Sequence, residues 1–215
     1  MIYNASMNIT VFGANGRVGS LVVAEALKKG HKVTAFVHGN SLFEDNPILS
    51  IVKGDVYNLD DVKNALSGSD CVISTLGSWG TPKKDILSMG MSNIVPAMKE
   101  LGIKRIVSLT GAGCRAYKAE TSMVEKLSRI PLVLLAPKIL KDAEKHMKIL
   151  NESNLDWTVL RSPVMNSSGD KMAYNIVNKY PVPWATINRE SVSLALLKLV
   201  ESDDYNKLPL FIQRA

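Results

Sequence analysis

Residues 10–19 read Thr10-Val-Phe-Gly13-Ala-Asn-Gly16-Arg-Val-Gly19. An apolar run leads into three glycines spaced three apart, and a helix-like stretch, residues 21–29, leaves them. A strand, a glycine turn and a helix in this order present backbone N–H groups and a helix N-terminus to a pyrophosphate. The alternative interpretation is a tight turn that binds no ligand. The surrounding sequence favours a dinucleotide, because Gly30 and a second strand, residues 31–37, complete a strand–helix–strand unit of about 30 residues.

The bulk composition is that of an ordinary globular domain. The 215 residues are 46% hydrophobic and 21% charged, so we expect one domain over residues 1–215. No apolar run reaches the length of a membrane span, and the start of the chain is too short and uncharged for a signal peptide. Two cysteines, Cys71 and Cys114, without a Cys-x-x-Cys pair, indicate a reducing, cytoplasmic location. Cys114 is either a plain loop residue or a reactive thiol.

The net charge of +6 comes from basic residues that are scattered rather than stacked in one run. A nucleic-acid-binding surface needs a focused basic stripe, so we expect neither nucleic acid nor a membrane as a partner. No His and Cys residues have the spacing of metal ligands, which predicts no metal.

Short apolar segments alternate with helical patterns along the chain. Strands are predicted at residues 8–12, 31–37, 49–53, 71–76, 104–109, 155–161 and 208–212. Helices are predicted at residues 17–29, 59–67, 84–101, 138–153 and 188–201. Continuous apolar, β-branched strands are typical of a parallel sheet that is covered on both faces. The expected fold is therefore α/β: a Rossmann-like, doubly wound parallel sheet with helices on both faces.

Two irregular segments, residues 111–136 and 163–187, are expected to form a small substrate-side region. Within the first, residues 132–136 are either a strand or a buried helical piece. Pro96 predicts a kink or a break in its helix.

Ligands of open α/β sheets bind beyond the carboxyl ends of the strands. After the first strand, the pyrophosphate is expected to contact Gly13, Asn15, Gly16, Arg17, Val18 and Gly19. After the second strand comes His38-Gly-Asn-Ser41, without the Asp or Glu that an NAD site places there. Arg17 and His38 can instead meet a 2′-phosphate, which favours NADP over NAD. Arg17 can also be a solvated residue at a helix start.

The later strand ends carry further candidates. Asp55 can accept from the adenine amino group or serve as a turn residue. The stretch Thr75-Leu76-Gly77 offers little bulk, which lets a nicotinamide ribose approach. Thr110 follows the fifth strand and Pro163 follows the sixth.

Several stretches resemble a known family. They are Gly13-Ala-Asn-Gly-Arg-Val-Gly19, Gly54-Asp55-Val56, Met89 to Lys99, Lys145 to Ser153, and Asp203-Asp-Tyr-Asn206. The chain resembles the atypical short-chain dehydrogenase/reductases of the NmrA-like, NAD(P)H-binding class, and within it the flavin reductase/biliverdin reductase B branch. The resemblance implies NADP, with Asp55 and Val56 beside the adenine and Pro163 beside the nicotinamide. It also implies a monomer that passes hydride from NADPH to a planar acceptor: a flavin, a quinone or a tetrapyrrole.

The sequence departs from this family at its proton donors. No Tyr-x-x-x-Lys unit lies in the expected region, and Gly111 stands where the reductase branch carries a serine, which leaves Thr110 as the nearest hydroxyl. Flavin reduction tolerates this loss, because the protein mainly supplies proximity and orientation. His146 either lines the acceptor side or is structural. The alternative function is a non-catalytic, NAD(P)-sensing regulator.

Overall fold

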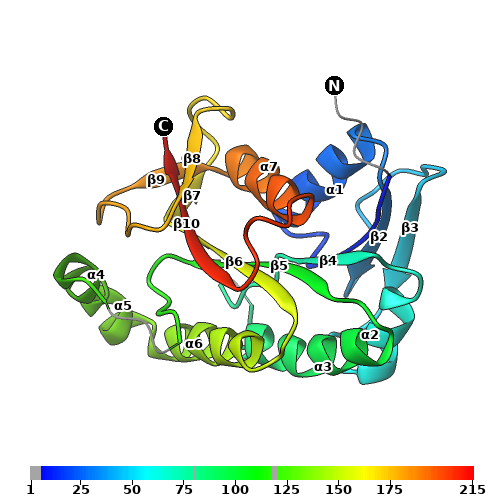
Figure 1. The fold of residues 1–215 in the computed structure, drawn as a ribbon, viewed down its shortest axis with the longest axis horizontal. Helices are drawn as coiled ribbons and strands as arrows, with labels where there is room; N and C mark the ends of the chain where they lie inside the picture. The colour runs from blue at the N-terminus through cyan, green and yellow to red at the C-terminus, as the bar shows by residue number, and fades with distance from the viewer. Residues whose placement is uncertain (1–5, 80, 118–120) are drawn as a thin grey trace.

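The structure, a computed structural model, describes residues 6–79, 81–117 and 121–215. An eight-stranded sheet runs in the order β3-β2-β1-β4-β5-β6-β10-β8, and every neighbouring pair is parallel except β10 with β8 (Figure 1). In this spatial order the strands span Leu49–Lys53, Lys32–Val37, Asn8–Phe12, Cys71–Ser74, Arg105–Gly111, Asp156–Ser162, Leu208–Arg214 and Tyr174–Val177. The first seven are the predicted strands, and the α/β Rossmann-like prediction is confirmed.

Helices cover both faces of the sheet (Figure 1). Helices α1 (Gly19–Lys28) and α7 (Arg189–Val200) pack together on one face. On the other face, α3 (Ile86–Glu100) packs between α2 (Leu59–Leu66) and α6 (Pro137–Asn151). Among the residues described, no helix is long and apolar enough to cross a bilayer.

Two apolar cores follow from this layering. Along β1, Ile9 and Val11 point into the core under α1 and α7, whereas Phe12 points into the core under α2, α3 and α6. Its ring centroid lies 5.0 Å from that of Phe36 on the neighbouring strand. Because both faces of the central strands are buried, these strands read as continuous apolar runs in the sequence.

Local signals explain where several helices begin and end. The Asn58 side chain accepts from the backbone N–H of Asp60 and caps α2, and Asn188 caps α7 in the same way through Glu190. Gly30 and Gly102 have φ angles of +83° and +74° and follow the ends of α1 and α3. Glycine adopts this left-handed conformation without steric cost.

Helix α3 runs without a break through Pro96; of the predicted kink or break, the break is therefore wrong. Of the two alternatives for residues 132–136, the helical one is correct, but the expected burial is wrong. They belong mostly to helix α5 (Ile130–Leu135), which contains no buried residue, and Leu134 and Leu135 are 74% and 85% exposed. Pro131 in the first turn of α5 is compatible with a helix start, and the leucines that follow are good helix formers. Helix α4 (Met123–Ser128) precedes α5 and was not predicted.

Residues 163–187 contain three short strands that the sequence pattern does not reveal. Strands β7 (Val164–Asn166) and β9 (Thr186–Asn188) pair in a separate parallel ribbon, and β8 joins the edge of the main sheet. Strands of three or four residues are too short to establish a period of two.

Candidate functional site

The glycine turn after β1 has the tightest backbone packing of the predicted site. Gly13 has a φ of +77°, and its carbonyl accepts from the N–H of Gly16 at 2.9 Å. A Cβ atom at Gly19 would lie 2.1 Å from the same carbonyl oxygen, and one at Gly16 would lie 3.0 Å from it. The three glycines are therefore required by the turn itself.

Two polar side chains hold this turn in place. The Thr75 hydroxyl donates to the carbonyl of Phe12 at 3.0 Å and to that of Gly13 at 3.2 Å. The Asn15 amide donates to the carbonyl of Asn40 at 2.8 Å, which ties the turn to the loop after β2. Three of the predicted site residues, Gly13, Asn15 and Thr75, are thus brought together.

The N-terminus of α1 follows the glycine turn. Its N-cap residue, Val18, makes no side-chain capping bond, and the first turn carries no acidic residue. The positive end of the helix dipole is therefore not neutralised by its own side chains. An anion placed against the turn would be stabilised by these N–H groups.

Asp55 lies at the carboxyl end of β3 beside Lys83, whose Nζ is 3.3 Å from the Asp55 carboxylate. Burial raises the pKa of Asp55, but the Tyr57 N–H and the Lys83 ammonium outweigh it and lower the pKa below its usual value. Lys83 also stacks over the Tyr57 ring at 3.8 Å, and the Tyr57 hydroxyl donates to Asp85 at 2.6 Å. Asp55 is therefore ionised and already paired.

These contacts between the end of β3 and the loop before α3 were not predicted. Lys83 and Asp85 are far from Asp55 along the chain, and only the parallel order of the strands brings them together. Gly90 was also missed as a site residue. A Cβ there would lie 2.7 Å from Leu76 and 3.1 Å from Val56, so α3 packs directly against these two predicted cofactor neighbours.

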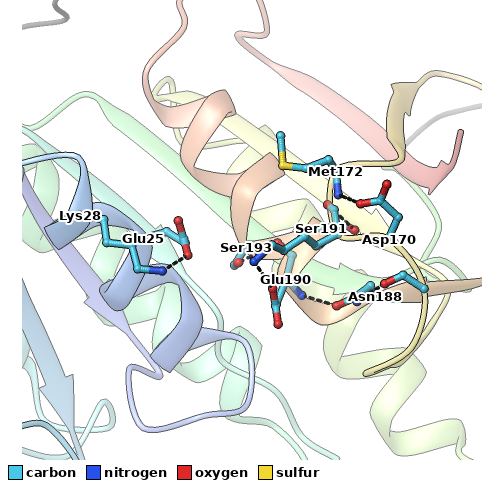
Figure 2. Close-up of polar contacts among 10 residues, drawn as sticks. Glu25, Lys28, Asp170, Met172, Asn188, Glu190, Ser191 and Ser193 are labelled. Carbon is cyan, nitrogen blue, oxygen red and sulfur yellow. Dashed lines mark hydrogen bonds and ion pairs between the residues drawn. The ribbon is translucent and has the colours of Figure 1, made fainter.

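Arg17 and His38, the two residues predicted to meet a 2′-phosphate, have different neighbours within the chain. The exposed Arg17 lines a hollow with Leu21, Ser167, Asn188, Arg189 and Glu190, at the start of α7. His38 instead acts electrostatically on Asp55. Figure 2 shows the polar contacts at the start of α7, where the side chain of Asn188 accepts from the N–H of Glu190.

His146 and Thr110 are both buried. The His146 ring has no exposed surface, and its Nε2 lies 2.8 Å from the Ser108 hydroxyl on β5. Burial lowers the pKa of His146 to about 4, so the ring is neutral near pH 7. The ring therefore faces Ser108 inside the core rather than an open surface.

Asp142 on α6 joins two parts of the site that the sequence does not relate. Its carboxylate accepts from the Ser78 hydroxyl at 2.5 Å and from the backbone N–H groups of Leu87 and Ser88 at 3.1 and 2.8 Å. It therefore caps α3 from another helix and fixes the loop that follows Gly77.

Cys114 is a buried loop residue. Burial raises the pKa of its thiol to about 12, which disfavours the reactive thiolate. Pro163 directly follows β6 and is half-buried. Among the described residues, no group of three or more His, Cys, Asp or Glu side chains could hold a metal ion.

Comparisons with known proteins identify the family of the chain. A family profile described as NAD(P)H-binding matches residues 13–203, and the chain belongs to this family. Membership of this family assigns NAD(P)H binding to the chain.

Two curated relatives illustrate the range of sequence likeness. The 2-alkyl-3-oxoalkanoate reductase of Shewanella oneidensis is 33% identical over 48% of this chain, but the match spans only 29% of that protein. Protein YwnB of Bacillus subtilis is 26% identical over 72% of this chain and 70% of its own length.

Solved structures share the fold. An oxidoreductase from Lactococcus lactis superimposes with a TM-score of 0.80 at 18% identity, covering 97% of this chain and 91% of that one. A short-chain dehydrogenase/reductase from Veillonella parvula, determined in complex with NADP, gives a TM-score of 0.77 at 18% identity, with 97% and 94% coverage.

Proposed function

We propose that the chain is an NADPH-dependent reductase that passes hydride to a planar acceptor such as a flavin. The glycine turn carries this proposal: a Cβ at Gly19 has no room, Thr75 fixes the turn, and the start of α1 has no acidic residue. This cradle fits a pyrophosphate. When bound there, NADPH would supply the hydride, and the protein would orient it.

The strand ends assign the remaining contacts. Asp55 and Val56 would bind the adenine, while Thr75, Leu76, Gly77 and Pro163 would lie along the nicotinamide half. No carboxylate follows β2, so His38 is free to meet a 2′-phosphate. Arg17 has no hydrogen bond or ion pair with another described residue, and its side chain would supply the second positive charge.

Among the planar acceptors, a flavin needs the fewest catalytic groups from the protein. At the end of β5 the nearest hydroxyl is that of the buried Thr110, and His146 would act as a positioning residue through Ser108. A flavin can take up a hydride without a tyrosine proton donor. A Streptococcus pneumoniae protein whose name proposes an NADH-flavin reductase shares the fold at 23% identity, with a TM-score of 0.76.

Steady-state oxidation of NADPH tests the proposal, with FMN, FAD, a soluble quinone and biliverdin as acceptors. We expect turnover with the flavins, and slower turnover with NADH than with NADPH. Tight NADPH binding without turnover on any of the four acceptors would refute the reductase assignment.

The second candidate function is an NAD(P)-sensing regulator without turnover. The missing Tyr–Lys pair favours it, and so does a likeness to the photosystem II assembly factor Ycf39 of Synechocystis, at 24% identity over 92% of this chain and 59% of that protein. The same assay separates the two functions, because a regulator binds NADPH and leaves it unoxidised.

A further inference from the structure

A second hollow lies beyond the end of β5, under helices α4 and α5. Its volume is about 230 Å³, and it is lined by three cations and three apolar side chains: Arg115, Lys126, Arg129, Ile130, Val133 and Leu134. The combination is unusual for a surface hollow, because cations and apolar side chains have opposite preferences for water. Together they match an anion attached to an apolar body.

Arg129 lines this hollow and is itself buried. It is 6% exposed, and its guanidinium forms an ion pair of 2.5 Å with Glu144 on α6. The Nε and Nη1 atoms of the same guanidinium are buried without a hydrogen-bond partner among the residues described. A buried N–H without a partner is costly, so an oxyanion that reached it would be stabilised.

The other two cations are unneutralised. The side chains of Arg115 and Lys126 are exposed and form no ion pair or hydrogen bond within the described part of the chain. Two acidic residues in the described part of the chain lie nearby and are already paired, because Glu144 pairs with Arg129 and the buried Glu125 lies 3.7 Å from Arg161. The hollow therefore has an excess of positive charge.

The arm formed by α4 and α5 adds an apolar surface. Its exposed apolar side chains are 48–85% accessible: Met123, Val124, Leu127, Ile130, Val133, Leu134 and Leu135. Figure 1 shows the arm projecting beyond α6 at one end of the molecule. A contiguous apolar surface of this kind on a globular protein marks a binding site.

The arm is attached at the edge of the sheet where ligands bind. Arg161, near the end of β6, contacts Glu125 of α4 and donates to the carbonyl of Cys114, which follows β5. Open α/β sheets bind their ligands beyond these carboxyl ends. The hollow is therefore on the side expected for the acceptor.

We infer that this hollow binds the acidic group of the acceptor, a phosphate or a carboxylate, while the apolar arm covers its planar body. The inference rests on the proposed reductase function and deepens it, because it restricts the substrate class to planar acceptors that carry an acidic group. Self-association through this face is disfavoured, because it would bring the cations of two copies together.

A matched pair of fluorescent probes tests the site without turnover. Anilinonaphthalene sulfonate is a planar anion, and N-phenylnaphthylamine has the same rings without the charge. We expect one saturable site that prefers the anionic probe about tenfold or more, equivalent to about 1.4 kcal/mol. The double variant Arg115→Gln/Lys126→Gln should remove this preference, and added salt should weaken it in the wild-type protein.

Lys138→Gln is the matched control, because Lys138 is exposed at the start of α6 and does not line the hollow. This variant should bind both probes as the wild type does. Equal affinity of the wild type for the two probes, or unchanged anion binding in the double variant, would overturn the inference.

FMN and riboflavin then connect the site to the acceptor, because they share one ring system and only FMN carries a phosphate. We expect a lower KM for FMN, and the double variant should raise it to the riboflavin value. Equal KM values in the wild type would overturn the assignment to the acceptor. If none of the flavins, the quinone or biliverdin is reduced although the anionic probe still requires Arg115 and Lys126, the reductase proposal fails and the anion site stands.

An anionic lipid headgroup is the other source of an oxyanion, and vesicle binding distinguishes it from a free acceptor. Co-sedimentation with phosphatidylglycerol vesicles but not with phosphatidylcholine vesicles, lost in the double variant, would overturn the acceptor assignment in favour of a lipid surface. We expect no co-sedimentation with either.

Discussion

Gly19 has no space for a side chain, and this single position tests the glycine turn. We expect Gly19→Ala to weaken NADPH binding more than tenfold and to destabilise the fold by about 1–3 kcal/mol, because the new Cβ would overlap the Gly13 carbonyl. Isothermal titration and urea unfolding measure the two effects.

The matched control is Gly39→Ala, because a Cβ there meets nothing within 4 Å. It should leave the free energy of unfolding unchanged. Wild-type NADPH affinity in Gly19→Ala would contradict the role of the turn.

His146 predicts a pH dependence of stability. Its pKa of about 4 in the folded protein lies below the ordinary histidine pKa of 6.5, so the unfolded chain binds a proton in the window between them while the folded protein does not. Stability from this group is complete above that window and is lost as the pH falls through it, by at most about 3 kcal/mol.

Replacing His146 with Gln keeps a hydrogen-bonding group near Ser108 and removes the titration. We expect urea unfolding of His146→Gln to lose less stability than the wild type on acidification through this window. Parallel pH profiles of the two proteins would show that another group is responsible.

At the level of helices and loops, Asp142 is the strongest cross-element contact near the site. Its carboxylate accepts hydrogen bonds from the Ser78 hydroxyl and from two backbone N–H groups of α3. Asp142→Ala should therefore lower the free energy of unfolding, measured with urea, by about 2 kcal/mol or more. Asp45→Ala, at an exposed loop position, should cost almost nothing. Similar losses in both variants would refute the capping role.

The sequence predicts long, periodic elements well and short ones poorly. The seven main strands and five long helices follow from apolar runs and helix caps such as Asn58. Helix α5 was misjudged because its leucines remain exposed, which apolar composition cannot indicate. The strands after Pro163 have too few residues to show a period.

The candidate site likewise has one part that the sequence predicts and another that it does not. The glycine turn is visible in the sequence because its constraint is local. The ion pair of Lys83 with Asp55 and the capping of α3 by Asp142 depend on strand order and helix packing, which no local pattern encodes. The placement of Arg17 beside the start of α7 is a tertiary result of the same kind.

At the scale of the whole molecule, helices cover both faces of the sheet. Its carboxyl edge carries the glycine turn after β1, which is the proposed dinucleotide site, and a cationic, apolar hollow after β5. The net charge of +6 suits both, because a phosphorylated cofactor and an acidic acceptor are attracted by the same field. The cofactor site is the part on which the rest depends.

Thermal unfolding with NADPH, NADP, NADH or NAD tests that site most directly. A ligand at 100 times its Kd should add about 2.7 kcal/mol of stability. We predict that all four raise the Tm, that the NADP forms do so at lower concentration, and that Arg17→Ala reduces their advantage. No rise in Tm with any of the four dinucleotides would contradict the central claim.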